Sequence, residues 1–445
     1  MATGSMMAAT SEETVDWISS APDDVLIMVL SRLPLKEAAR TSILSRRYRY
    51  LWTHSTKLDF DASETLARIL DDMLIKENDR DEYMSWVDQV IVASQAPVLD
   101  CFRVRFYLDS RHSDKIDSWI KFALERRVQS LELVMISDLR VLYPHYTFPS
   151  FTCGVEFLTS LDLVDVDITS EGLTCLLSKC LLLEKFHIAR SRNLNHFEIA
   201  AGPPLRLKCL SILWEVITIT ISAPTPDLLS FRFCGGVKSL HIESAPKLID
   251  LFINRHPAPL SLVLRPLMHS FSQLQTLSFS LFMGWKKAIR ITPLLPEMTC
   301  LKHLTLRVYS FNSDTRLHGL TSLIKKAPSL QRLTIKMSRL GARVKLKTKR
   351  FHKYSHPSLR VMELRGFEGS TNDIELALYL LSIATLPEKL IIDLRHAYLD
   401  GYYAFEERAK LEGAVNRALE LRSLMAPEVQ LVVNLLADSQ EACMD

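Results

Sequence analysis

The stretches LKHLTL (301–306) and LQRLTI (330–335) share one pattern, apolar-x-x-apolar-x-apolar. In an extended strand this pattern puts the last two apolar side chains on one face and the residue between them on the other. The pattern recurs at spacings of roughly 20 to 30 residues, a period typical of leucine-rich repeats. Its eleven copies begin at Leu99, Val128, Leu158, Leu183, Leu207, Leu228, Leu248, Leu274, Leu301, Leu330 and Leu359. The sequence therefore predicts an irregular leucine-rich-repeat solenoid, whose stacked units bury a core that no unit could bury alone.

The stretches between these copies differ in length and predict different connections. The longer ones have room for helices, as in SDKIDSWIKFALE (113–125) and HGLTSLIKKA (318–327). Around the copies at 207, 228 and 248 the units are shorter and carry two further strand-like runs, VITITI (216–221) and VKSLHI (237–242). We expect strands on both faces of the solenoid there.

The residue between the last two apolar positions of each copy must point away from the core. These residues are Arg103, Glu132, Asp162, His187, Ser211, Arg232, Phe252, Ser278, Thr305, Thr334 and Glu363. Their mixed chemistry suits protein recognition better than a uniformly basic nucleic-acid track. The seven largest are the candidate target-facing residues: Arg103, Glu132, Asp162, His187, Arg232, Phe252 and Glu363. For any one of them, plain solvent exposure is the alternative.

A different pattern occupies the N-terminal stretch APDDVLIMVLSRLPLKEAARTSILSRRYRYLW (21–52). It predicts three short helices, the first ended by Leu33-Pro34 because proline disfavours helix in the residue before it. Leu26, Leu30 and Leu33 form the stripe of the first helix, the second runs over 35–43, and Ser45 caps a third that carries Tyr48, Leu51 and Trp52. A module of about forty residues rarely stabilises itself through its own core. Its apolar surface is therefore expected to contact either a partner or the domain that follows.

This stretch also resembles an F-box of the plant type, through Pro-Asp-Asp, Leu-Pro-Leu-Lys-Glu-Ala, Leu-Ser-Arg-Arg and Leu-Trp. The resemblance implies a Skp-type adaptor, and through it a cullin, as partners. The adaptor-binding residues that it implies are Pro22, Leu26, Leu30, Leu33, Pro34, Tyr48 and Trp52. Two positions depart from the pattern: Ala21 stands in place of leucine and Tyr48 in place of tryptophan. Alanine removes a large anchor, so reduced adaptor affinity is expected.

The last ninety residues resemble the FBD region that follows such repeats in plant F-box proteins. The matching segments are 356–384, EKLIIDL (388–394) and 420–433, which predict a strand, a Gly-containing turn, a helix, a strand, a helix and a closing strand. This region is expected to act as the C-terminal cap of the solenoid. The predicted α/β organisation is 1–15 disordered, 16–57 F-box, 58–97 helical connector, 98–350 leucine-rich repeats and 351–440 FBD-like region.

Composition limits the cellular compartments and the classes of binding partner that we expect for this protein. The 445 residues carry a formal net charge of +3, which gives no reason to expect nucleic acid. The eight cysteines form no C-x-x-C pair and are interpreted as buried free thiols in a reducing compartment; they are Cys101, Cys153, Cys175, Cys180, Cys209, Cys234, Cys300 and Cys443. The first fifteen residues do not resemble a secretory signal, and no apolar run reaches membrane-spanning length. We expect a soluble protein of the nucleus and/or cytoplasm, without a membrane partner.

Candidate chemistry is sparse. None of G-x-x-x-x-G-K-[ST], G-x-G-x-x-G, G-x-S-x-G or H-E-x-x-H occurs. His187, His241 and His303 fall in separate units, where exposed or hydrogen-bonded side chains are expected rather than metal ligands. The basic run RVKLKTKRFHK (343–353) is interpreted as a solvated loop, with phosphate or import-receptor binding as the alternative. No catalytic residue, metal or cofactor is expected.

The leading hypothesis is a non-catalytic substrate receptor, which docks to a Skp-type adaptor and holds an unknown protein target for ubiquitin transfer. The alternative is a repeat scaffold with weak or lost adaptor binding, motivated by Ala21. An enzyme is the third and most distant hypothesis.

Overall fold

The structure is a computed structural model. It describes residues 17–62, 77–136, 144–151, 153–199, 205–222, 225–254, 264–282, 295–309, 318–338, 354–394 and 406–434. The chain divides into two compact units, residues 1–143 and 144–445. The disordered segment 1–15, part of the helical connector and the basic run 343–353 were predicted for residues that lie outside the described ranges.

The first unit joins short helices to three parallel strands. Its elements are α1 (Trp17–Ser20), α2 (Asp23–Leu30), α3 (Leu35–Arg40), η1 (Thr41–Ile43), η2 (Leu51–His54), β1 (Lys57–Asp61), α5 (Glu77–Ala93), β2 (Cys101–Phe106), η3 (Ser110–His112), α6 (Ser113–Glu125) and β3 (Ser130–Met135). β1 pairs with β2 and β2 with β3, both in parallel. Helix α6 spans the residues predicted for it, since Ile116, Trp119 and Ile120 form its buried face.

Two predictions for this unit are wrong. The third helix of the N-terminal stretch is absent: Arg46–Tyr50 form turns, and only the single 3-10 turn η2 follows. The segment is held by side chains instead, because Tyr48 enters the core and Arg47 contacts the start of α2. The connector is not wholly helical, because its first residues form β1, with Leu58 and Phe60 buried at alternate positions.

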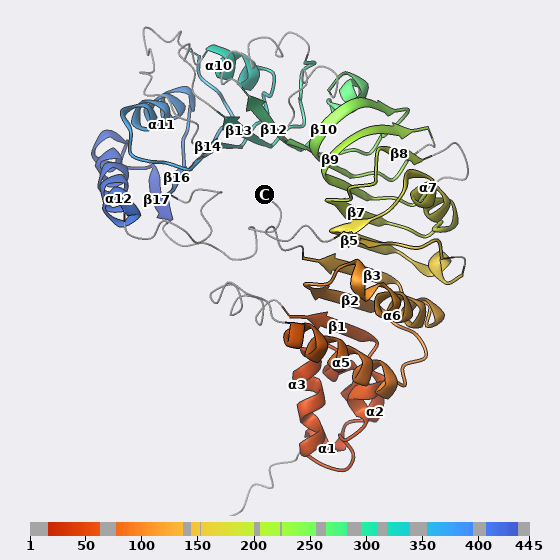
Figure 1. Ribbon diagram of the computed structural model, residues 1–445. Coiled ribbons are helices and arrows are strands. Elements are labelled where there is room, and N and C mark those ends of the chain that lie inside the picture. Colours follow the sequence, from red (N-terminus) through yellow and green to blue (C-terminus); the bar gives the residue numbers. More distant parts are fainter. Residues whose placement is uncertain are drawn as a thin grey trace, which may run out of the picture. The chain divides into compact units, whose positions relative to one another are not determined.

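The second unit is a ladder of parallel strands. Its elements are β4 (Tyr146–Thr147), η4 (Val155–Phe157), β5 (Ser160–Val164), β6 (Val166–Asp167), α7 (Ser170–Lys179), β7 (Lys185–Ala189), β8 (His196–Ile199), β9 (Cys209–Ile221), β10 (Ser230–Ile242), β11 (Asp250–Asn254), η5 (Arg265–Ser270), β12 (Thr276–Phe282), β13 (His303–Tyr309), α10 (His318–Lys325), β14 (Arg332–Ser338), β15 (Val361–Arg365), α11 (Thr371–Ile383), β16 (Lys389–Asp393), α12 (Glu406–Leu424) and β17 (Gln430–Asn434). Strands β5, β7 and β9 to β17 pair in succession. Helices α10, α11 and α12 lie on one side of this ladder (Figure 1).

All eleven copies of the repeat pattern form strands, as predicted. The runs 216–221 and 237–242 are also extended, but they continue β9 and β10 rather than forming separate strands on a second face. Register shifts interrupt this pairing at Cys234/Gly235 and Val237/Ser239, and β8 pairs with the second half of β9.

The FBD-like region has the predicted order of elements, and its strands β15, β16 and β17 extend the ladder. The turn before α11 contains Gly369, whose φ of +74° favours glycine. A Cβ there would lie 3.0 Å from the Ala414 Cα, so the turn also needs glycine for the close approach of α12. Ser370 and Asp373 then form a capping box at the start of α11.

The cysteines are free thiols in the described residues, but most of them are not buried. Cys180 and Cys234 are buried, whereas Cys153, Cys175 and Cys300 are exposed. Cys175 was expected in the core with Cys180; it lies instead on the outer face of α7, whose inner face is Leu173, Leu176 and Leu177. Burial raises the pKa of the Cys180 thiol to about 12, and the nearby Glu156 carboxylate adds to this effect.

Candidate interaction surfaces

Helix α2 divides its apolar side chains between a core and a surface. Pro22 precedes the helix, with Asp23 and Asp24 in its first turn. Leu26 and Leu30 are buried together with Ala38, Tyr48 and Leu51, and Ala21 and Trp52 pack against this cluster. The N-terminal module therefore has a small core of its own.

This core includes part of the adaptor-facing set, whose contact with an adaptor stays a prediction. Leu26, Leu30 and Tyr48 have almost no surface to offer a partner, since they contact one another inside the module. Pro22, Leu33 and Pro34 are exposed as expected, and Trp52 is half-buried. The reason is that α2 is apolar on both sides, so its periodicity alone cannot tell the inner stripe from the outer one.

An exposed stripe lies on the opposite side of α2. We use the name exposed stripe for Pro22, Val25, Met28, Val29 and Leu33, which are all solvent-exposed. Val25, Met28 and Val29 have the i, i+3, i+4 spacing of one helix face. The leucine spacing does not single out these three residues, although the unbroken apolar run VLIMVL (25–30) is a signal for them. Such an apolar face on a small module is typical of a protein interface.

Polar contacts fix the start of α2 relative to the segment after α3. Arg47 donates from Nε to Asp23 Oδ1 at 2.7 Å and also donates to the Ala21 carbonyl oxygen. These contacts hold the beginning of the exposed stripe in place, although the pair is too exposed to stabilise the fold strongly.

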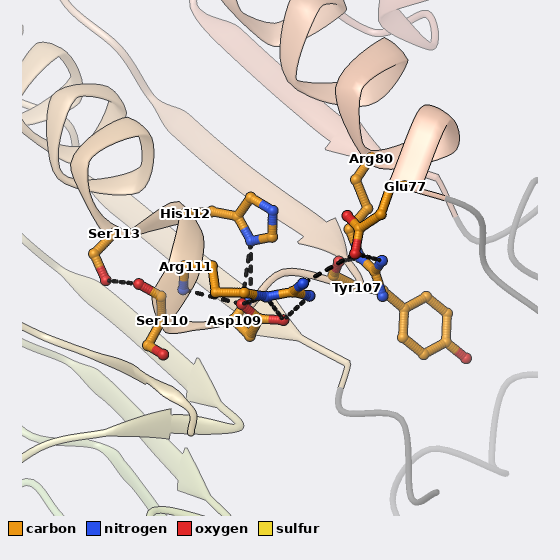
Figure 2. Close-up of polar contacts among 8 residues, drawn as sticks. All are labelled: Glu77, Arg80, Tyr107, Asp109, Ser110, Arg111, His112 and Ser113. Carbon is orange, nitrogen blue, oxygen red and sulfur yellow. Dashed lines mark hydrogen bonds and ion pairs between the residues drawn. The ribbon is translucent and has the colours of Figure 1, made fainter. Parts of the chain in front are cut away.

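A cluster of titratable residues joins α5 to the loop after β2 (Figure 2). Arg111 donates to Asp109 and, through Nη1, to Glu77 Oε1 at 3.0 Å. Arg80 also contacts Glu77 at 3.0 Å. Burial raises the pKa values of the Glu77 and Asp109 carboxyls. The Arg111 guanidinium, joined at Glu77 by Arg80, outweighs this effect, so both pKa values are lowered. The cluster is charge-matched and contributes to structure.

The outward residues of the repeat pattern align across the strands. In the first unit Asp59, Arg103 and Glu132 are neighbours in register. In the second unit the middle row runs through Asp162, His187, Ser211, Arg232, Phe252, Ser278, Thr305, Thr334 and Glu363. The predicted alternation is confirmed, because the flanking apolar residues are buried while most of this row is half-exposed; Thr334 and Glu363 are buried. Contact with a target stays a prediction.

Neighbouring strands also supply partners for the charged members of these rows. The Nε atom of Arg103 lies 2.5 Å from Oε2 of Glu132, and its Nη1 atom lies 3.2 Å from Oδ2 of Asp59. Burial lowers the pKa of Arg103, but its hydrogen bond and charge interactions with Glu132 raise it by more, so the net shift is upward. Arg103 and Glu132 therefore neutralise one another instead of presenting free charges to a target.

The middle row of the second unit contains two further pairs. His187 lies 3.9 Å from Asp162, and the Arg232 guanidinium stacks 4.6 Å from the centre of the Phe252 ring. Burial, with the positive charges of Arg232 and Arg190, lowers the pKa of His187 to about 4. His187 is therefore neutral at pH 7. His241 and His303 are exposed, as expected.

Glu363 is the most enclosed member of the target-facing set. It accepts hydrogen bonds from Arg332 and Arg365, each at 2.6 Å, and from Thr334 at 3.1 Å. Burial raises its pKa, but the two arginines outweigh burial and the net shift is downward. Glu363 orders its neighbours and has little surface of its own for a target.

An apolar patch lies in the next outward row, two residues further along each strand. Ala189, Leu213 and Cys234 are in register and buried, and they form a cluster with the half-buried Val164 of the same row and Phe252 of the middle row. The repeat pattern does not predict this patch, because the pattern defines only one outward position per repeat. The outward face of the second unit therefore has polar rows beside an apolar patch of which only Val164 and Phe252 are partly exposed.

In the part of the chain that the structure describes, no group of His, Cys, Asp and Glu residues could hold a metal ion. No helix among the described residues is long and apolar enough to span a membrane.

Comparison with known proteins gives two domain matches. Residues 22–59 match the F-box domain, and residues 149–410 match the family described as "At1g61320/AtMIF1, LRR domain".

Three curated relatives come from Arabidopsis thaliana. The chain is 29% identical over 323 residues to the putative FBD-associated F-box protein At5g56440, covering 62% of this chain and 72% of that protein. It is 26% identical over 365 residues to the F-box/LRR-repeat protein At3g03360, covering 73% of this chain and 71% of that protein. It is 31% identical over 205 residues to F-box/LRR-repeat protein 13, covering 41% of this chain and 43% of that protein.

Proposed function

The chain belongs to the F-box proteins with a leucine-rich-repeat domain of the At1g61320/AtMIF1 family, and on this premise we propose that it is the substrate-recognition subunit of an SCF-type cullin ubiquitin ligase. Proteins of this family are generally non-catalytic ligase subunits. The proposal assigns adaptor binding to the F-box and target binding to the outward face of the repeats, inside the cell in the nucleus and/or cytoplasm.

The observation that carries this proposal is the exposed stripe of the F-box. Leu26 and Leu30 on one side of α2 are buried in the F-box core. Val25, Met28 and Val29 on the other side are exposed, as are Leu33 and Pro34 after the helix. Covering these side chains would stabilise a complex by removing apolar area from water. We place the Skp-type adaptor on this stripe.

The repeat ladder supports the receptor half of the proposal. Its outward face combines the partly exposed apolar side chains Val164 and Phe252, an arginine stacked on Phe252 and a buried carboxylate that orders two arginines. Apolar anchors with satisfied polar groups around them are the usual composition of a protein-binding surface. The protein target itself is unknown.

A repeat scaffold without adaptor binding is the alternative, and Ala21 is the residue that motivates it. Ala21 packs against the F-box core. The missing leucine therefore removes packing inside the module as well as any contact with an adaptor. Because Ala21 faces this core, we expect alanine at this position to lower adaptor affinity by less than the loss of a side chain that contacts the adaptor directly.

The test changes the exposed stripe and leaves the core intact. Met28→Lys with Leu33→Lys puts two charges into the proposed contact, and lysine near the end of α2 is compatible with the helix dipole. We expect co-precipitation with a Skp-type adaptor at micromolar concentration to fall by at least about tenfold. The matched control is Val92→Lys, because Val92 is 86% exposed on α5 outside the stripe.

Adaptor binding that survives the double substitution would move the docking surface away from α2. If the unmodified chain itself bound no Skp-type adaptor, the scaffold hypothesis would replace the receptor hypothesis.

A further inference from the structure

Strands β13 to β16 present three outward rows in register. The first row is His303, Arg332, Val361 and Lys389, the middle row is Thr305, Thr334, Glu363 and Ile391, and the third row is Arg307, Lys336, Arg365 and Asp393. The inward positions between them are filled by buried Leu, Ile and Met side chains such as Leu333, Ile335 and Met362. All three rows therefore lie on the face that points away from the core.

The charges on these rows do not balance. The cations are Arg307, Arg332, Lys336, Arg365 and Lys389, and the anions are Glu363 and Asp393. Glu363 is 3% exposed, Asp393 is 1% exposed and the cation Arg307 is 5% exposed, whereas 41% of the Arg332 side chain is exposed. Lys336, Arg365 and Lys389 are half-exposed. The charge that meets solvent on these strands is therefore positive.

The buried carboxylate of Glu363 fixes part of this charge in position. It binds Arg332 on β14 and Arg365 on its own strand, each at 2.6 Å. One buried carboxylate thus orders two guanidiniums. Because both side chains are already ordered, a ligand that pairs with them loses less conformational entropy on binding.

The preceding strands lack an excess of positive charge. On β5 to β11 the charged outward residues of the three rows are Asp162, Lys185, Arg232 and Asp250, which balance. The outward residues of β12 up to Ser280 are uncharged. The positive field is therefore confined to β13 to β16, and the apolar patch lies at the other end of the same face.

We propose that the outward face of β13 to β16 binds an acidic, aspartate- and glutamate-rich segment of the protein target. Four strands at about 4.8 Å spacing span roughly 14 Å, and the first and third rows are separated by about 13 Å along the strands. An extended segment that crosses the strands presents a side chain to this face about every 7 Å, so carboxylates at alternate positions can meet successive cations. This inference rests on the proposed function, because it takes the outward face of the repeats as the target-binding face.

The test is anisotropy titration of the full-length chain with a fluorescein-labelled peptide of about twelve residues in which glutamate and alanine alternate. The variant Lys336→Glu with Lys389→Glu reverses two half-exposed charges and leaves the arginines on Glu363 in place. We expect at least about tenfold weaker binding, and an affinity that falls as salt is added. The control is Lys185→Glu, because Lys185 occupies the same row on β7 as Lys389 does on β16; it should change affinity by less than about twofold.

Three results would overturn the inference: no binding of the acidic peptide, equal binding of a peptide with glutamine in place of glutamate, or equal weakening by Lys185→Glu. Binding of a phosphoserine-alanine peptide without binding of the glutamate peptide would assign the face to a phosphorylated segment instead. Circular dichroism of each variant checks that the ladder is intact.

Adaptor co-precipitation separates this inference from the proposed function. If the adaptor binds but the acidic peptide does not, the receptor role stands and the acidic target is wrong. If the peptide binds but the adaptor does not, the ligase role is wrong and the acidic-segment site stands.

Discussion

The hydroxyl of Tyr48 makes no hydrogen bond with the described residues of the F-box core. The side chain and its Oη are buried. A buried hydroxyl without a partner loses its hydration and gains nothing in return. Tyr48→Phe keeps the ring and its packing, so we expect the free energy of unfolding of the F-box to rise by about 1 kcal/mol.

Chemical denaturation of the two proteins measures this difference, with adaptor affinity as a second readout. Because Tyr48 lies in the core, the substitution should leave adaptor affinity unchanged. A destabilised Tyr48→Phe variant would mean that the hydroxyl does have a partner, such as an ordered water.

Single residues of the candidate surfaces were only partly predictable from the sequence. The repeat pattern predicts on which face of the sheet Arg103 and Glu363 lie, because the face of a side chain depends only on its position along the strand. The pattern could not show that Glu132 neutralises Arg103 or that Arg332 and Arg365 enclose Glu363, because these partners come from other repeats. Likewise, only the folded module shows that Leu26 is in the core and Val25 at the surface.

At the scale of elements, the contact between α5 and the loop after β2 depends on charge. The folded-state pKa values of Glu77 and Asp109 are lowered, so each contributes stability above its unfolded pKa. That contribution is lost as pH falls through the lower, folded-state values, that is, below about pH 4. Asp109→Asn can still cap η3 but carries no charge, so it should be less stable than the unmodified chain at pH 7 and should lose less stability on acidification.

Denaturant unfolding at neutral and acidic pH measures this effect. The control is Asp114→Asn, because Asp114 is exposed in the first turn of α6 and takes no part in the cluster of Figure 2. An equal change of pH dependence in both variants would assign the effect to the general charge of the protein.

Elements were predictable where a pattern repeats and unpredictable where it occurs once. Each of the eleven repeat strands has buried alternate positions, and the copies support one another. The strand β1 has the same alternation but begins with Lys57 and lies before a stretch of helical pattern, so it was assigned to the connector. The predicted third F-box helix does not form. Its residues adopt turns, in which Tyr48 packs in the core and Arg47 binds Asp23.

At the scale of the whole molecule, the sequence suggests that the F-box can be removed at residue 57, whereas the structure places the F-box and β1 to β3 in one compact unit. The backbone N–H groups of Gln95 and Asp100 donate to the carbonyl oxygens of Thr53 and Thr56, and Lys36 on α3 lies 4.7 Å from the Trp86 ring on α5. A cut at residue 57 removes these partners from a unit that keeps its other elements.

We therefore expect the fragment 144–445 to fold as a recognition domain and the fragment 58–445 to carry a destabilised first unit. Thermal unfolding followed by circular dichroism should show one main transition for 144–445 and an added transition at lower temperature for 58–445. Fragment 144–445 keeps both the apolar patch and the basic strands β13 to β16, so it should bind the acidic peptide as the full chain does, yet support no ubiquitylation because it lacks the F-box. If 144–445 were unfolded while 58–445 were stable, the first unit would be required for the fold of the repeats, and adaptor binding and target recognition would not be separable by truncation at this boundary.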